Sequence, residues 1–214
     1  MDALIQTLHP ALCLGRQLTL AASGARLFSR QGDWDGGSTL HCVAMALALL
    51  GKLPDPVRIP SRQSTAAAKL WDQAWPHYLH GLTLTELASF LWELNAGVRP
   101  VEKSGNPAAL LRFCTRELAS GWPVIVGWGQ RHPARHHAAL AIGVEARRVG
   151  RTTTPQALLL LDPAEAEPSL AGCNARMAFA PSGESLRTAC VTATATRNVT
   201  LEGAVSIRLI TRQP

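Results

Sequence analysis

The sequence predicts an α+β protein in which a set of helices precedes an antiparallel sheet. Helix-favouring composition, capping residues and periodic apolar positions occur between residues 38 and 121. After Gly121 the pattern changes to short β-branched and alternating runs at 123–128, 137–145, 157–162, 188–195 and 203–211. Helices followed by strands are typical of a segregated α+β layout and not of alternating βαβ units.

The helical signals divide the first part of the chain into four segments. Residues 1–30 precede them and predict an amphipathic lead-in and a short strand that ends near Phe28. The helix starts and stops are set by glycine, by proline and by a Thr-x-x-Glu capping box. The expected helices are a buried one over 38–50 closed by Gly51, one over 66–75 before Pro76, one from Thr83 to Gly97 and one from Asn106-Pro107 to Gly121.

Length and composition favour a single domain that spans residues 1–214. A chain of 214 residues with 47% hydrophobic and 17% charged residues can bury a sizeable core. The recognisable motifs fall within about 28–165. The remaining stretch, 166–214, is expected to add further strands to the sheet or to form a small appended piece.

The charge balance and the apolar runs limit the classes of partner. The net charge is +6, but only Arg147, Arg148 and Arg151 cluster, as in a solvated hairpin tip, so we expect no nucleic-acid partner. No run approaches 18 apolar residues, so no membrane span is expected. The N-terminal residues do not match a signal peptide, since Asp2, His9 and Pro10 stand where basic residues and a long apolar run would be needed. This predicts a cytoplasmic protein or one exported without a cleaved signal. The oligomeric state is left open.

Cysteine and histidine usage predicts neither a disulfide framework nor a cofactor. The five cysteines are an odd number without close pairs, and the contexts of Cys114 and Cys190 predict buried, inert thiols at these two positions. His132 and His136 have the i, i+4 spacing of a zinc site, with His137 adjacent to them. Pro133 and the lack of a neighbouring Glu oppose a metalloprotease helix, so we expect no metal and no cofactor.

A histidine and an aspartate end two strands that are predicted to be neighbours. If 137–145 and 157–162 pair as a hairpin, His137 and Asp162 reach the same end of adjacent strands and come within hydrogen-bond distance. There Asp162 would orient the imidazole and stabilise its cation. Strand alternation predicts that His137, and not His136, faces the cleft, in phase with Ala139 and Ala141. The alternative is a strand-edge histidine beside a turn-forming Asp-Pro.

Four motifs in order carry a family resemblance over about residues 28–165. They are the Ala-Met helix that ends in Gly51, the strand Pro123-Val-Ile-Val, His137 with Gly143 six residues later, and Leu-Leu-Asp162-Pro163. In this order the chain resembles the papain-superfamily cysteine peptidases that cut bacteriocin leaders after a double glycine. The resemblance implies a papain-like fold, with N-terminal helices packed on a C-terminal antiparallel sheet. It also implies His137 as general base and Asp162 as its orienting partner.

The nucleophile is where the chain departs from that family. The relatives have a cysteine, usually followed by glycine, about thirteen residues before the closing glycine, and here that position is Ser38. Cys42 lies one helical turn later on the same face. Cys42 is the nucleophile if the helix begins at His41. Otherwise Ser38 holds that position, naturally or by replacement of a cysteine, or the site is inactive and Cys42 is a core thiol.

The remaining implied site residue is an oxyanion donor. The resemblance assigns this role to Gln31, seven residues before Ser38, although an exposed loop glutamine is the alternative. Trp34 is expected at the cleft entrance or in the core. The predicted function is a cysteine-peptidase or amidase type of domain that acts on a peptide or protein substrate. The alternative is an inactive pseudo-peptidase that binds a peptide or protein.

Overall fold

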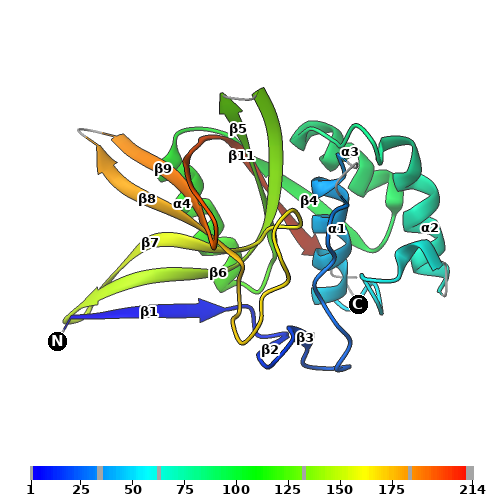
Figure 1. Ribbon diagram of the computed structural model, residues 1–214, viewed down its shortest axis with the longest axis horizontal. Coiled ribbons are helices and arrows are strands. Elements are labelled where there is room, and N and C mark those ends of the chain that lie inside the picture. The colour runs from blue at the N-terminus through cyan, green and yellow to red at the C-terminus, as the bar shows by residue number, and fades with distance from the viewer. Residues whose placement is uncertain (1, 33–35, 62–63, 132–133, 183–184, 211–214) are drawn as a thin grey trace.

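The computed structural model describes residues 2–32, 36–61, 64–131, 134–182 and 185–210, and its centre is one large antiparallel sheet (Figure 1). Nine strands of the described residues join it, in the order β10-β9-β8-β7-β6-β5-β11-β4, with β1 paired to β6. These strands are β1 (Asp2–Leu8), β4 (Val98–Lys103), β5 (Val124–Arg131), β6 (Ala134–Val149), β7 (Thr152–Leu161), β8 (Ala175–Ser182), β9 (Ser185–Thr192), β10 (Thr196–Asn198) and β11 (Thr200–Leu209). A separate small sheet contains β2 (Leu12–Cys13) and β3 (Thr19–Leu20).

Four α-helices and two short 3-10 turns complete the described part of the chain. They are α1 (Ser38–Leu49), η1 (Ile59–Ser61), α2 (Thr65–Ala74), η2 (Trp75–His77), α3 (Leu84–Leu94) and α4 (Pro107–Ala119). The expected capping box is present, since Thr83 Oγ1 accepts a hydrogen bond from the Glu86 amide and the Glu86 carboxylate accepts one from the Thr83 amide. Asn95, in the left-handed conformation, ends α3 two residues before Gly97. In the described residues, no helix combines the length and apolar character needed to cross a membrane.

The long strand β6 organises the sheet. Along one edge it pairs with β7. Along the other edge its first half pairs with β5 and its second half pairs with β1, so that these two strands lie end to end. Gly143 stands at the junction, where a Cβ atom would lie 2.5 Å from the carbonyl oxygen of Thr7. A glycine is therefore required where β1 approaches β6.

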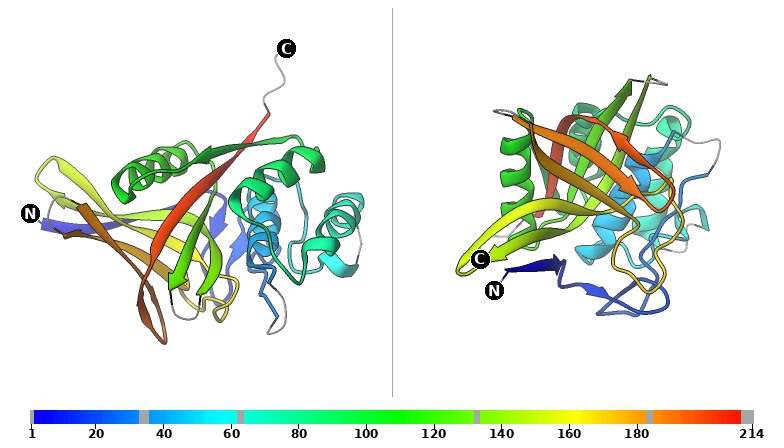
Figure 2. Two further views of the ribbon diagram at one scale, coloured as in Figure 1. Left: turned by 90° about the horizontal axis from the view of Figure 1, so that it is seen from above. Right: turned by 60° about the vertical axis from the view of Figure 1, so that its left-hand side comes forward.

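Helices cover both faces of this sheet, which buries alternate residues of each central strand on opposite sides. Leu140 and Ile142 belong to the core formed with α1, α2 and α3. Ala139, Ala141 and Leu158 belong to a second core formed with α4. Figure 1 shows α1, α2 and α3 gathered at one side, and Figure 2 shows α4 apart from them across the strands. The apolar runs at 138–142 and 157–161 are uninterrupted because both faces of these strands are buried.

The predicted papain-like α+β arrangement, with N-terminal helices on a C-terminal sheet, is therefore contradicted. The structure is dominated by its nine-stranded sheet, and two of these strands, β1 and β4, come from the part of the chain that was expected to be helical or irregular. Neither strand is predicted by its local sequence. The alternation in β1 matches an amphipathic lead-in, and Pro100 in β4 argues against a strand. Because β4 lies at the edge of the sheet, it tolerates a proline.

Candidate functional site

His137 and Asp162 form a contact between a histidine and a buried acid at the end of the central strands. β6 and β7 pair as the hairpin interpretation requires, and the Nε2–H of His137 donates to Asp162 Oδ1 at 2.7 Å. Asp162 is only 4% exposed, whereas the side chain of His137 is 22% exposed. The ring of Trp128, the cross-strand partner of His137, meets the imidazole edge to face at a centroid distance of 4.9 Å. The imidazole is thus held between an acid and an aromatic ring while one edge stays accessible.

Asn174 fixes the backbone of Asp162. Its Oδ1 accepts from the Asp162 amide at 2.7 Å, and its Nδ2 donates to the Asp162 carbonyl at 2.9 Å and to the Ala166 carbonyl at 3.0 Å. The Asp162 carboxylate also accepts from the Ala164 amide at 3.0 Å. Asn174 was not among the predicted site residues, because nothing in a loop twelve residues after Asp162 indicates this contact. The clamp restricts the direction in which the carboxylate can point.

Ser38 occupies the first residue of α1, beside the histidine strand. Its Oγ accepts a hydrogen bond from the Ala138 amide at 3.4 Å, and Ser38 is 4% exposed. Since that amide nitrogen is bonded to the carbonyl carbon of His137, Ser38 Oγ lies within about 6 Å of the His137 Cα atom. Ser38 and His137 also line one cavity of about 290 Å³. The hydroxyl and the imidazole therefore share one site.

Cys42 lies inside the core and not at this cavity. The helix begins at Ser38, so the alternative in which it begins at His41 is wrong. Cys42 is fully buried, its Sγ is 3.8 Å from the Ala138 carbonyl oxygen, and it does not line the cavity. Burial, and secondly the negative charge of Asp162, raise the pKa of the Cys42 thiol well above its usual range. A thiol in this environment stays protonated and is a poor nucleophile.

The structure does not place Gln31 among the residues that line the Ser38 cavity. Gln31 is half-buried. Its backbone N–H donates to the backbone carbonyl of Pro163, the residue after Asp162, at 2.9 Å. The segment before α1 therefore passes close to Asp162 at Gln31. Its role as an oxyanion donor stays a prediction. Trp34, expected at the cleft entrance or in the core, lies outside the described residues.

His136 lines the same cavity as His137, so the expectation that only His137 would face the cleft is wrong. The strand phase used to predict this is also misleading, because Ala139 and Ala141, in phase with His137, pack toward α4. His136 is 79% exposed at its side chain and donates from Nδ1 to Glu202 Oε1 at 2.7 Å. What distinguishes His137 is its contact with the buried Asp162.

No metal centre is evident in the described residues, where no group of three or more His, Cys, Asp or Glu side chains could hold an ion. His136 and His137 are each engaged by a different carboxylate. His132, the third histidine of the zinc alternative, lies outside the described residues.

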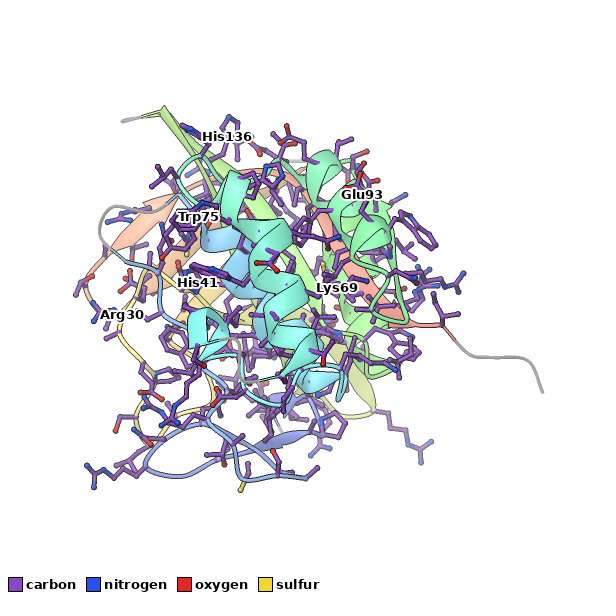
Figure 3. All side chains as sticks on the ribbon, turned by 90° about the vertical axis from the view of Figure 1, so that its right-hand side faces the viewer. Arg30, His41, Lys69, Trp75, Glu93 and His136 are labelled. Carbon is purple, nitrogen blue, oxygen red and sulfur yellow. The ribbon has the colours of Figure 1, made fainter. Side chains whose placement is uncertain are left out.

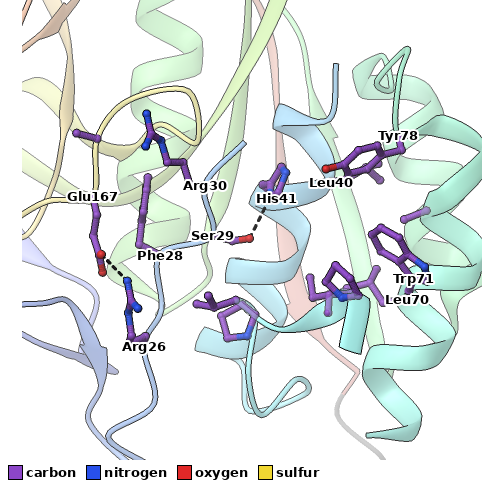
Figure 4. A pocket seen from close by; sticks show the side chains of 16 residues that line it. Arg26, Phe28, Ser29, Arg30, Leu40, His41, Leu70, Trp71, Tyr78 and Glu167 are labelled. Carbon is purple, nitrogen blue, oxygen red and sulfur yellow. Dashed lines mark hydrogen bonds and ion pairs between the residues drawn. The ribbon is translucent and has the colours of Figure 1, made fainter. Parts of the chain in front are cut away.

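A second, larger cavity flanks α1 on its other side. It encloses about 500 Å³, and Leu40 and His41 of α1 contribute to its wall. Figure 3 looks onto this side of the molecule, and Figure 4 shows the cavity itself. This cavity was not predicted from the sequence, although the aromatic residues Trp71, Trp75 and Tyr78 are closely spaced there, and Trp71 and Tyr78 line the cavity. Their rings contact one another, with centroid distances from 5.4 to 6.0 Å.

No family model matches the chain, and no curated protein matches it. The resemblance to peptidases that process bacteriocin leaders accordingly stays a prediction.

Proposed function

We propose that the cavity at the start of α1 is a hydrolytic site for a peptide or amide bond. Ser38 holds the nucleophile position, His137 is the general base and Asp162 orients the imidazole. The observation that carries this proposal is the 2.7 Å hydrogen bond between His137 and the buried Asp162, with Ser38 on the wall of the same cavity. Nucleophile, base and orienting acid are the three parts that such catalysis requires.

The contact between His137 and Asp162 supports one direction of proton transfer in this proposal. Because Nε2 of His137 is engaged by Asp162, Nδ1 is the nitrogen that would take the proton from Ser38 Oγ. Oγ would then bond to the substrate carbonyl carbon, while the electron pair of the C=O bond moves onto the oxygen. Collapse of this intermediate would break the C–N bond, and His137 would return the proton to the leaving amine. Water, activated by the same imidazole, would hydrolyse the resulting ester.

The start of α1 favours the negative charge that develops on the carbonyl oxygen. The first amide groups of a helix lack partners within the helix, and the helix dipole places positive potential there. α1 has no acidic residue in its first turn that would cancel this potential. Oxyanion stabilisation by the α1 N-terminus is therefore consistent with a nucleophile at its first residue.

A peptide in extended conformation suits the walls of this cavity. Gly36 and Gly81 pack backbone against backbone, since a Cβ atom on Gly81 would lie 2.5 Å from the Gly36 carbonyl oxygen. Gly127 adds a third residue without a side chain. Walls without side chains leave room for the main chain of a substrate to approach closely.

The second candidate function is peptide binding without cleavage. It is favoured by Ser38 itself, because a hydroxyl is a far weaker nucleophile than a thiolate and this one is nearly buried. The cavity, the glycine walls and the histidine would then hold a peptide, and no bond would break. The reactivity of a cysteine introduced at position 38, compared with that of Ser38 itself, distinguishes the two functions.

The test uses Ser38→Cys in a Cys13→Ser background, because Cys13 is the exposed cysteine of the five. Alkylation by iodoacetamide is followed against pH for this variant and for the same variant carrying His137→Ala. We expect a thiol that reacts below pH 7 and that loses this reactivity with His137→Ala. Cys42→Ala is the matched control and should leave the profile unchanged.

Wild-type protein is labelled in parallel with a fluorophosphonate, which reacts with activated serines. Labelling at Ser38 that disappears in His137→Ala supports a hydrolase. A reactive thiol in the Ser38→Cys variant, together with an unlabelled Ser38 in the wild type, supports the peptide-binding module. An unreactive thiol in the Ser38→Cys variant would show that His137 and the helix do not activate this position and would overturn the proposal.

A further inference from the structure

The second cavity has the walls of a ligand site and is separate from the proposed hydrolytic site, with which it shares no lining residue. It lies between α1, α2, the segment 26–30 and the loop at 166–167 (Figure 4). Its volume of about 500 Å³ is within the range of small-molecule sites. Most of the wall is apolar, with side chains that include Phe28, Leu40, Val57, Ile59, Leu70 and Trp71. A hydrophobic body would be desolvated here on several sides.

The polar groups of the cavity are few, and most of them are already engaged. Arg26 forms an ion pair with Glu167 at 2.6 Å, and Ser29 Oγ shares a 2.8 Å hydrogen bond with His41 Nδ1. Figure 4 shows both contacts, with Arg26, Phe28 and Glu167 on one side and Trp71 and Tyr78 on the other. These contacts fix the side chains that surround the apolar space.

Arg30 differs from these groups. It lines the cavity and is exposed, and within the described part of the chain it forms no ion pair. Among the described residues of the wall, Glu167 is the one carboxylate, and it is engaged by Arg26. Among the described residues, the cavity therefore combines an apolar interior with a guanidinium at its margin that no carboxylate engages, which is complementary to an anion attached to a hydrophobic group.

We propose that this cavity binds an apolar carboxylate, with the hydrophobic body against Trp71, Leu70 and Phe28 and the carboxylate paired with Arg30. Two sources share this chemistry. One is the C-terminal residue of a peptide with a large apolar side chain, and the other is a free fatty acid. The proposal does not depend on the hydrolytic function, because it involves neither Ser38 nor His137.

Calorimetric titration of the full-length protein with three probes tests this site. N-acetyl-L-phenylalanine represents a peptide C-terminus, decanoate represents a fatty acid, and N-acetyl-L-phenylalaninamide retains the aromatic body but lacks the charge. We expect at least one carboxylate to bind in a 1:1 ratio and the amide to bind about tenfold more weakly, since a charge-assisted hydrogen bond is lost. Preference for the phenylalanine derivative indicates a peptide end, and preference for decanoate indicates a fatty acid.

Two variants locate the binding. Arg30→Gln should weaken carboxylate binding about tenfold and leave amide binding unchanged, with Arg151→Gln, at the exposed turn after β6, as its control. Val57→Trp should fill the cavity and abolish binding of all probes. Val57 is 36% exposed, so the larger ring does not have to enter the core, and Val149→Trp, at a position that is 56% exposed, is the matched control.

Equal affinity for the acid and the amide would overturn the proposal, as would carboxylate binding that survives Arg30→Gln. Binding that survives Val57→Trp would place the ligand elsewhere, with the same consequence. The absence of saturable binding by either carboxylate would also reject it.

Discussion

At the scale of single residues, the site depends on how the environment separates chemically similar groups. Ser38 and Cys42 lie one helical turn apart, and both contact the backbone of Ala138. Ser38 lines the cavity, whereas Cys42 is enclosed in the core. His136 and His137 are sequence neighbours, but only His137 contacts a buried acid. In both pairs, the surroundings of the side chain, and not its residue type alone, decide which member belongs to the candidate site.

Removal of Asn174 should weaken the site without touching Ser38 or His137. In Asn174→Ala the Asp162 backbone loses two hydrogen bonds, so the carboxylate should stabilise the His137 cation less well. In the Ser38→Cys background we expect alkylation at pH 6 to slow about tenfold, which corresponds to a rise of about one unit in thiol pKa. Asn198→Ala, on the exposed edge strand β10, is the control. A lower melting temperature with an unchanged pH profile would reduce Asn174 to a structural role.

Replacement of Cys42 should affect packing alone. Cys42→Ala removes one buried sulfur and should lower the free energy of unfolding by about 1 to 2 kcal/mol, as for other small truncations in a core. Because burial keeps its thiol protonated, the native protein should not be alkylated at Cys42 at pH 7. Peptide mapping after brief iodoacetamide treatment measures this. Rapid modification of Cys42 would contradict its place in the core.

At the scale of elements, the contact between α4 and β11 depends on a buried carboxylate. Glu117 on α4 is 2% exposed and accepts hydrogen bonds from Ser206 at 2.9 Å and from Arg208 at 2.7 and 2.8 Å. Burial alone would raise the Glu117 pKa, but the hydrogen bonds from Arg208, Ser206 and Arg116 outweigh it and lower that pKa. The ionised carboxylate thereby joins the helix to the strand that lies between β5 and β4.

Glu117→Gln should therefore destabilise the protein in a manner that depends on pH. A carboxyl pKa that is lower in the folded state stabilises the fold above the unfolded value of about 4.3, and this contribution is lost as the pH falls through the folded pKa. We expect a loss of about 2 to 3 kcal/mol at pH 7, because Arg208 loses its charged partner. Urea unfolding at pH 7 and pH 3.5 should show this difference narrowing at the lower pH. Glu93→Gln, at an exposed position on α3, should show little effect at either pH.

At the scale of the whole molecule, helices on both faces of one sheet create two apolar cores. Leu140 on β6 belongs to the core with α1, and Leu158 on β7 belongs to the core with α4. Both side chains are almost completely buried. The cavities lie at the two sides of the α1 N-terminal turn, where Ser38 faces one and His41 faces the other.

Matched truncations test this two-faced arrangement. Leu140→Ala and Leu158→Ala should each lower the free energy of unfolding by about 2 to 5 kcal/mol, since each removes a fully packed leucine from a different core. Denaturant titration measures both losses. A small effect of Leu158→Ala would indicate that the face toward α4 is not closely packed and would support a sheet covered on one face.

Local signals in the sequence determined the elements whose ends are set by neighbouring residues. The apolar run after Ser38, the Thr83–Glu86 box and the Asn106-Pro107 start each predict a helix that is present. The β6–β7 hairpin follows from two apolar runs and a polar turn, and it carries the contact between His137 and Asp162. Such features can be predicted because they depend on hydrogen bonds and periodicity within short segments.

The tertiary structure alone decided how distant segments combine. β1 and β4 are strands because they pair with β6 and β11, respectively. No local pattern in either segment specifies that pairing. Ser38 and Cys42 lie on the same face of α1, and they differ in depth: Ser38 at the first residue lines the cavity, whereas Cys42 one turn later is enclosed in the core. The cavity beside Arg30 brings together the segments 26–30, 56–60, 70–78 and 166–167, which lie far apart in the chain. Contacts of this kind depend on the three-dimensional path of the backbone, which a single sequence pattern does not contain.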